Sequence, residues 1–168
     1  MKALFITLVV LLLGSVNLHC QYIERNSNFS ITFPEKPEQV KYPGQDDGFM
    51  LVYTSSKEQY TIQVICITVP PKDRENPSNI DLTGISKLSF ESYLRAAGGG
   101  TLIKQEMTKI QNHRASVGSF KLDNVYRVYN YSKMLFSYTG EYMYIIAFYY
   151  NNTPSTFNNY VNSFKIFK

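Results

Sequence analysis

Apolar and polar residues alternate along most of this chain with the period of two that a half-buried β-strand shows. The alternation and the β-branched runs predict strands over residues 29–33, 38–42, 49–54, 59–69, 101–110, 114–122, 125–138, 141–150 and 165–167. Short polar or glycine- and proline-containing stretches separate these strands, including a turn at 55–58. The pattern therefore predicts a sheet made largely from consecutive antiparallel strands.

Apolar residues recur at helical spacing in two places, at Phe90, Tyr93, Leu94 and Ala97 and again at Phe157, Tyr160, Val161 and Phe164. The first set predicts a helix over 84–97, with Ser86 or Ser89 as its N-cap and the glycines at 98–100 as its stop. The second set predicts a helix that Pro154 opens. The chain thus combines a meander of strands with two helices.

The last predicted hairpin is apolar on both faces. A two-residue loop at 139–140 would pair Tyr138 with Glu141. One face then carries Tyr129, Tyr131, Leu135, Tyr144, Ile146, Phe148 and Tyr150, and the other carries Val128, Met134, Phe136, Met143, Ile145, Ala147 and Tyr149. A sheet with one solvated face alternates cleanly, so both sides of this ribbon should be covered. We therefore expect an α+β fold, an antiparallel β-sheet flanked by helices.

The N-terminus predicts export. A charged start precedes an apolar run over 3–13 that is too short to span a bilayer, and a glycine and a polar stretch follow it. We interpret residues 1–20 as a signal peptide, 21–28 as a flexible N-terminus and 29–168 as a single domain without a transmembrane segment. The expected location is secreted or periplasmic. A lipid anchor through Cys20 is the alternative, although bulky His19 fits that interpretation poorly.

Composition narrows the chemistry further. After cleavage only Cys66 remains, so no intrachain disulfide forms and packing must stabilise the fold. The formal net charge is +4, and residues 101–168 carry eight Lys or Arg against three Asp or Glu. Without a basic run, ordinary solvation of strand faces explains this excess better than an anionic partner does.

Two short stretches resemble the PsbP family. The sequence FSITFPEKP at 29–37 is similar to the opening strand and proline-bracketed turn of PsbP-like domains, and YVNSFKIF at 160–167 is similar to their closing helix and strand. The resemblance covers nearly all of 28–168 and implies an α/β/α sandwich around an antiparallel sheet. PsbP-like proteins are largely accessory or binding proteins without a shared catalytic site, so the resemblance carries over no functional residue.

No catalytic or metal-binding motif is present. His113 is the one histidine beyond the predicted signal peptide, and it is expected in a turn. Cys66 shares a strand face with Ile62 and Val64, which favours a core thiol over a nucleophile. Zinc motifs are missing, and we expect no catalytic residue, no metal and no cofactor.

The sharpest binding hypothesis is a stripe of aromatic and basic residues, Arg127, Tyr129, Tyr131 and Lys133, on one strand face. Exposed, these side chains suit a sugar or a lipid headgroup through stacking and charge. Covered by a helix, the tyrosines are ordinary core with their hydroxyls at the edge. Export argues against nucleic acid as a partner.

The sequence is best interpreted as an exported, non-enzymatic accessory or binding protein with an unknown protein or small-molecule partner. The alternative is a small secreted hydrolase that uses carboxylates near the helix–glycine loop at Gly98, for which a pair such as Glu91 and Glu106 is available. A third option, a component of an exported toxin or its neutralising partner, rests only on size and compartment.

Overall fold

A computed structural model describes residues 22–26, 28–44, 48–57, 59–96, 98–123, 129–151 and 157–167. Its strands are β1 (Tyr22–Arg25), β2 (Phe29–Phe33), β3 (Glu38–Pro43), β4 (Phe49–Lys57), β5 (Tyr60–Thr68), β6 (Gly100–Ile110), β7 (His113–Leu122), β8 (Tyr131–Tyr138), β9 (Tyr142–Tyr150) and β10 (Lys165–Ile166). The helices are α2 (Leu82–Ala96) and α3 (Phe157–Ser163), with a 3-10 turn at Pro71–Asp73. The expected α+β fold class is therefore observed. The predicted signal peptide lies outside the described residues.

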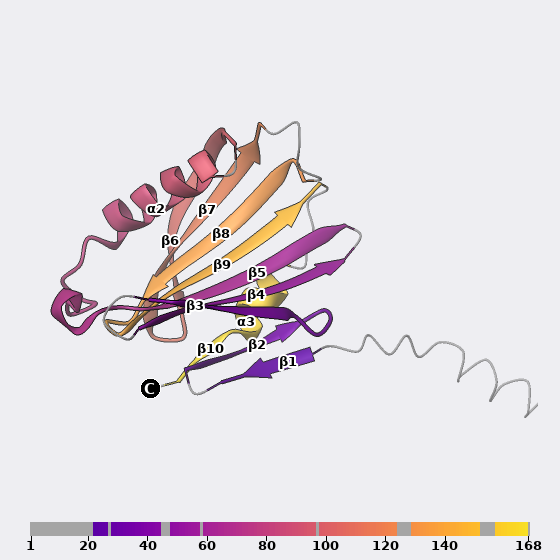
Figure 1. Cartoon of the computed structure of the whole chain (residues 1–168). Helices are drawn as coiled ribbons and strands as arrows, with labels where there is room; N and C mark the ends of the chain where they lie inside the picture. Colours follow the sequence, from indigo (N-terminus) through magenta and orange to yellow (C-terminus); the bar gives the residue numbers. More distant parts are fainter. Residues whose placement is uncertain are drawn as a thin grey trace, which may run out of the picture.

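Seven strands form one antiparallel sheet in the order β3-β4-β5-β9-β8-β7-β6 (Figure 1). Most neighbours in the sheet are also neighbours in the chain, as the meander of strands predicts. The exception is β9, which pairs with β5 as well as with β8 and so joins the N-terminal strands to the C-terminal ones. The smaller sheet has the order β1-β2-β10.

The β8–β9 hairpin has a longer connection than the sequence predicts. Tyr138 pairs with Met143 rather than Glu141, because the amide of Thr139 donates to the carbonyl of Tyr142 and closes a four-residue turn in which Gly140 takes a positive φ. Lengthening an even loop by two residues leaves every side chain on its predicted face. Apart from Tyr129, the described members of both apolar sets therefore lie together as expected, on opposite sides of the sheet.

Helix α2 covers one of these sides. Its Phe90 packs edge-on against Phe120 of β7, and both rings are buried. The helix begins two residues before the predicted position, because the carboxylate of Asp81 accepts a hydrogen bond from the amide of Gly84. The predicted caps Ser86 and Ser89 are wrong, since their hydroxyls donate to carbonyls one turn back inside the helix.

The predicted glycine stop is confirmed. The amides of Gly98 and Gly99 donate to the carbonyls of Arg95 and Leu94, and both glycines have a positive φ. Such a turn satisfies carbonyls that the helix end leaves unpaired, and glycine adopts it without the steric cost of a Cβ atom. The chain then enters β6 at once.

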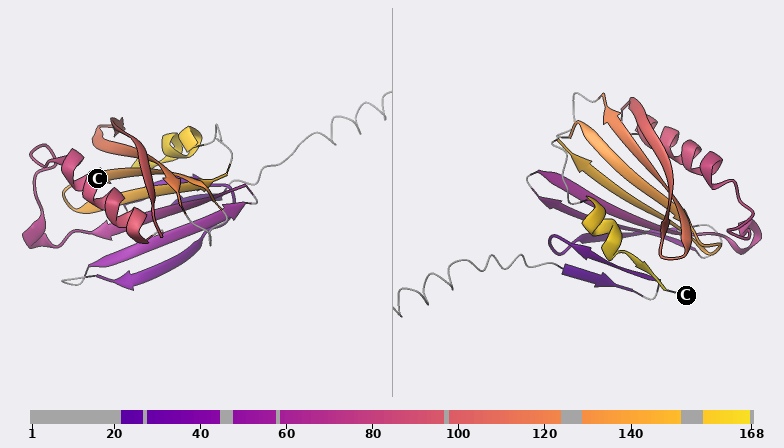
Figure 2. Two further views of the ribbon diagram at one scale, coloured as in Figure 1. Left: turned by 90° about the horizontal axis from the view of Figure 1, so that it is seen from above. Right: turned by 180° about the vertical axis from the view of Figure 1, so that it is seen from behind.

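The other side of the large sheet is covered by β2, β10 and α3, which Figure 2 shows from behind. Phe29, Ile31 and Phe33 of β2 are fully buried against it, and Phe157 of α3 packs edge-on against Phe148 of β9. The hydroxyls of Tyr60 and Tyr160 also meet, at 2.9 Å. This cover is a strand layer plus one short helix, so helices alone do not provide it.

Two predicted irregular segments are in fact strands. Residues 22–25 were expected to belong to a flexible N-terminus, whereas they form β1 and pair with β2 from Tyr22↔Phe33 to Arg25↔Ser30. Residues 55–57 were expected in a turn, whereas they extend β4 opposite β5. In both cases most of the side chains are polar, but the backbone N–H and C=O groups pair with a neighbouring strand. Side-chain polarity alone does not reveal such pairing.

Candidate functional site

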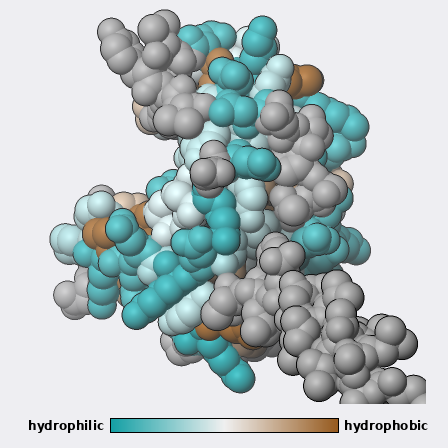
Figure 3. All heavy atoms as spheres, turned by 90° about the vertical axis from the view of Figure 1, so that its right-hand side faces the viewer, coloured by the Kyte–Doolittle hydropathy of each residue, from teal (hydrophilic) through white to brown (hydrophobic). Residues whose placement is uncertain are grey.

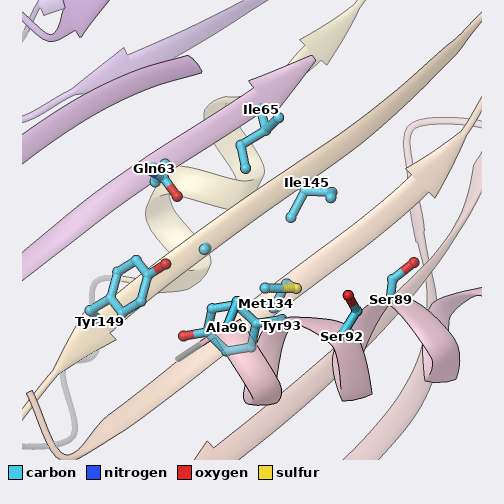
Figure 4. Close-up of a pocket in the computed structure, with 10 residues that line it drawn as sticks. Gln63, Ile65, Ser89, Ser92, Tyr93, Ala96, Met134, Ile145 and Tyr149 are labelled. Carbon is cyan, nitrogen blue, oxygen red and sulfur yellow. The ribbon is translucent and has the colours of Figure 1, made fainter. Parts of the chain in front are cut away.

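Helix α2 covers only part of its side of the large sheet. Its main contacts are with β6, β7 and β8, and it reaches β9 where the ring of Tyr93 packs beside Tyr149; on the same side of β5, β4 and β3 no described helix lies over the sheet. A groove of about 220 Å³ follows the boundary. Figure 4 shows the residues that line it: Ser89, Ser92, Tyr93 and Ala96 on α2, and Gln63, Ile65, Met134, Ile145, Ala147 and Tyr149 on the strands.

The wall that α2 gives to this groove is made mostly of small side chains. Ile85, Ser89, Ser92 and Ala96 follow one another at spacings of four, three and four residues, which places them on one side of the helix. Ser89, Ser92 and Ala96 line the groove, and Ile85 lines a second hollow of about 260 Å³ further along the helix. Small residues let another chain approach the helix backbone closely.

The floor beyond the groove is an apolar surface that crosses four strands. Two rows of directly paired residues make it, which we name the apolar band: Ile145, Ile65, Val52 and Val40 in one row, and Met143, Ile67, Met50 and Tyr42 in the next. None of the eight is buried, and Val40 and Tyr42 on the edge strand are each 45 % exposed. Figure 3 shows another side of the molecule, on which hydrophobic side chains form only small separate patches.

A polar row borders the apolar band on one side. Gln63, Thr54 and Glu38 are paired in register on β5, β4 and β3, and the amide of Gln63 donates to the hydroxyl of Thr54 at 3.4 Å. The band therefore changes from apolar to polar within one residue pair along each strand. Such an edge would orient an amphipathic partner rather than a uniformly apolar one.

The predicted aromatic-basic stripe is not a single stripe. Arg127 lies outside the described residues. Tyr129 packs beside Tyr149 on the α2 side of the sheet, and its hydroxyl lies 3.1 Å from that of Thr61. Tyr131 instead stacks on Tyr150 on the opposite side, because β8 begins only at residue 131 and Tyr129 precedes its regular alternation.

Lys133 follows Tyr131 on the same face of β8. Its ammonium lies over the ring of Phe157 at 5.3 Å from the centroid, at the base of α3. Tyr131 and Lys133 are both half-buried. The structure therefore brings together two of the four predicted residues, at the margin of the α3 cover, and separates Tyr129 from them.

The candidate groups for catalysis lie apart. Glu91 is on α2, whereas Glu106 pairs with Val117 on the opposite face of the sheet, so the sheet lies between the two carboxylates. His113 begins β7 beside the turn at Gln111–Asn112. Cys66 is fully buried, and this burial raises the pKa of its thiol to about 12. No arrangement for the alternative hydrolase emerges among the described residues.

Among the described residues, no three His, Cys, Asp or Glu side chains gather closely enough to hold a metal ion. Neither α2 nor α3 has the length and apolar character that a membrane crossing needs, and no other described segment is helical over such a length. The pKa values of Tyr144 and Tyr160 are raised by burial, as expected for core tyrosines.

Sequence reasoning missed the apolar band. Its signal is present in the strand over 60–68, where Ile62, Val64 and Cys66 alternate with Ile65 and Ile67, so that both faces are apolar. Two apolar faces were also the reason to expect cover on both sides of β8 and β9. In β5, by contrast, no described helix covers the second apolar face.

Comparisons with known proteins address the fold. No family model matches the chain, and no curated protein matches it. A solved structure does: the solution structure of cyanobacterial PsbP (CyanoP) from Synechocystis sp. PCC 6803 superposes with a TM-score of 0.62 at 15 % sequence identity, covering 92 % of this chain and 96 % of that one. At this identity the similarity concerns fold, and it agrees with the resemblance at the two ends of the sequence: this chain has a PsbP-like fold.

Proposed function

We propose that this protein is an exported, non-enzymatic accessory protein that binds an amphipathic helix of a partner protein on the apolar band beside α2. Residues 1–20 serve as the signal peptide, and 29–168 form the single PsbP-like domain. The observation that carries the proposal is that, among the described residues, no helix covers β5, β4 and β3 on the α2 side of the large sheet. In this arrangement the large sheet is the middle layer of an α/β/α sandwich, and the partner helix completes the layer that α2 begins.

The dimensions favour a helix as the occupant. Seven strands at about 4.8 Å make a sheet about 29 Å wide, whereas one helix with its side chains is about 10 Å across. A second helix beside α2 fits over β9, β5 and β4. Ser89, Ser92 and Ala96 allow it to approach α2 closely, and the polar row at Gln63 and Thr54 meets its polar side.

The proposal is tested first with a neutral apolar dye, Nile red, which does not respond to the charge of the protein. We expect the folded protein to bind the dye and Val52→Ser/Ile67→Ser to bind it at least fivefold more weakly. The matched control is Ile23→Ser/Leu88→Ser, which removes two exposed apolar side chains elsewhere and should bind like the parent. A folded band variant that binds the dye as the parent does would overturn the proposal.

A peptide tests the shape of the partner. A synthetic amphipathic helix with leucine on one side and glutamine on the other should displace Nile red from the parent protein. A scrambled peptide of the same composition, which cannot gather its leucines on one side, should not. Equal displacement by both peptides would contradict a helical partner, even if the apolar band itself binds the dye.

A further inference from the structure

The opposite face of the large sheet carries a cluster of lysines on β6, β7 and β8. Lys104, Ser119 and Lys133 are paired in register across the three strands. Thr101, Lys121 and Tyr131 form the next row. Side chains paired in this way lie on one face, and this face is the α3 side, because Tyr131 stacks on Tyr150 there. We name these six residues the lysine face.

Its cations are available to a ligand. Lys121 is exposed, and the side chain of Lys104 is 62 % exposed. Lys133 is half-buried, and its ammonium lies over the ring of Phe157. One strand, β7, lies between Lys104 and Lys133, so their backbones are about 10 Å apart, and Lys121 lies on that middle strand. The three lysines therefore form a triangle rather than a single anion pocket.

One acidic side chain lies among them. Glu106, also on the α3 side of β6, makes an ion pair with Lys104, and both side chains are more than half exposed. An exposed pair of this kind is weak, because water and salt screen it. Lys104 can therefore exchange this carboxylate for an anion of a ligand, and Glu106 opposes the binding of that ligand.

We infer that the lysine face binds an acidic polysaccharide chain, one that carries sulfate or carboxylate groups. The separated lysines match charges that are spread along a chain, which a single phosphate does not provide. The hydroxyls of Thr101, Ser119 and Tyr131 lie between the lysines and supply donors and acceptors for sugar hydroxyls. The inference uses two residues of the predicted stripe, Tyr131 and Lys133, and it does not depend on the apolar band.

The test is the affinity of the full chain for a sulfated oligosaccharide prepared from heparin, measured by titration calorimetry. Lys104→Gln/Lys121→Gln/Lys133→Gln should weaken binding at least tenfold. The matched control Lys36→Gln/Lys87→Gln/Lys165→Gln removes the same charge from exposed positions on the β2–β3 connection, α2 and β10, respectively. This control should weaken oligosaccharide binding less than threefold. Thermal unfolding of each variant verifies that it is folded.

A substitution of opposite sign makes the test specific. Glu106→Gln should tighten binding more than Glu38→Gln does, although both raise the net charge by one. Equal effects at the two glutamates, or equal losses in the two triple variants, would overturn the inference. Competition by inorganic triphosphate at equal charge concentration would also overturn it, because the site would then respond to charge alone. The band variant Val52→Ser/Ile67→Ser should bind the oligosaccharide like the parent, which separates this inference from the proposed function.

Discussion

Gly118 of β7 offers a sharp test of how α2 is seated on the sheet. A Cβ atom at this position would lie 2.5 Å from Cζ of Phe120 and 2.9 Å from Cε2 of Phe90. Carbon atoms in contact normally stay about 3.5–4.0 Å apart, so Gly118→Ala would overlap both rings by about 1 Å. Both rings are buried, at 0 % and 1 % exposure, and have little space into which to move.

The cost can be given a magnitude. Overpacking by a methyl group destabilises a well-packed core by about 1–3 kcal/mol. For a domain of this size, about 2 kcal/mol lowers the midpoint of thermal unfolding by roughly 4–8 °C. The assay is chemical denaturation followed by circular dichroism. Ser119→Ala is the matched control, because its side chain lies on the other face of the same strand, and it should change stability by less than about 0.5 kcal/mol.

A double-mutant cycle assigns the cost to the helix. If the methyl group clashes with Phe90 of α2, then Gly118→Ala should be better tolerated in a Phe90→Leu background, with a coupling energy of about 0.5 kcal/mol or more. An unchanged or raised stability of Gly118→Ala alone would show that α2 does not pack on β7 in this way. Strict additivity of the two substitutions would place the clash at Phe120 only.

Three further outcomes follow from the core. Cys66, whose thiol has a pKa raised to about 12 by burial, should react with a disulfide reagent only as fast as the protein unfolds, and fast reaction of the folded protein would contradict its placement. Burial raises the pKa values of Tyr144 and Tyr160, so the folded state holds protons that the unfolded state loses above the ordinary value of 10.0. The contribution of these two groups to the free energy of unfolding should be constant below about pH 9 and fall as the pH rises above 10, so the measured free energy of unfolding should fall less steeply above pH 10 in Tyr144→Phe than in the parent. The hydroxyl of Tyr138 accepts a hydrogen bond from the amide of Glu75 at 2.9 Å. Tyr138→Phe should therefore lower the free energy of unfolding by about 1–2 kcal/mol and speed hydrogen exchange at the Glu75 amide. Unchanged exchange at Glu75 would exclude this contact.

The faces of the terminal hairpin were predictable because they depend on parity alone. Alternation along residues 131–150 places Leu135 and Met134 on opposite faces of the sheet, whether the loop has two or four residues. The register was not predictable, because it depends on the turn that Thr139 and Tyr142 close. The start of α2 was missed for a similar reason: the cap is Asp81, outside the apolar pattern that marks the helix.

The candidate surfaces depend on the order of the strands in the sheet. The alternation of apolar and polar residues predicts which residues of one strand share a face, but it does not predict that order. Val40, Val52 and Ile65 are neighbours through the consecutive strands β3, β4 and β5, and Ile145 joins them only because β9 pairs with β5. The lysine face likewise needs the order β8-β7-β6 to bring its cations together. The stripe hypothesis used alternation within one strand, and it failed at Tyr129 because the regular strand begins two residues later.

The central claim is that the α2 side of β5, β4 and β3 is open to solvent and to a binding partner. The direct measurement is the rate at which a maleimide reagent labels Val52→Cys, in a full chain that carries Cys20→Ser so that Cys66 is the internal reference. We predict that Cys66 stays protected and that the new thiol reacts at least a hundredfold faster, because Val52 lies in the apolar band and Cys66 faces the covered side. Equal protection of both thiols would contradict the account.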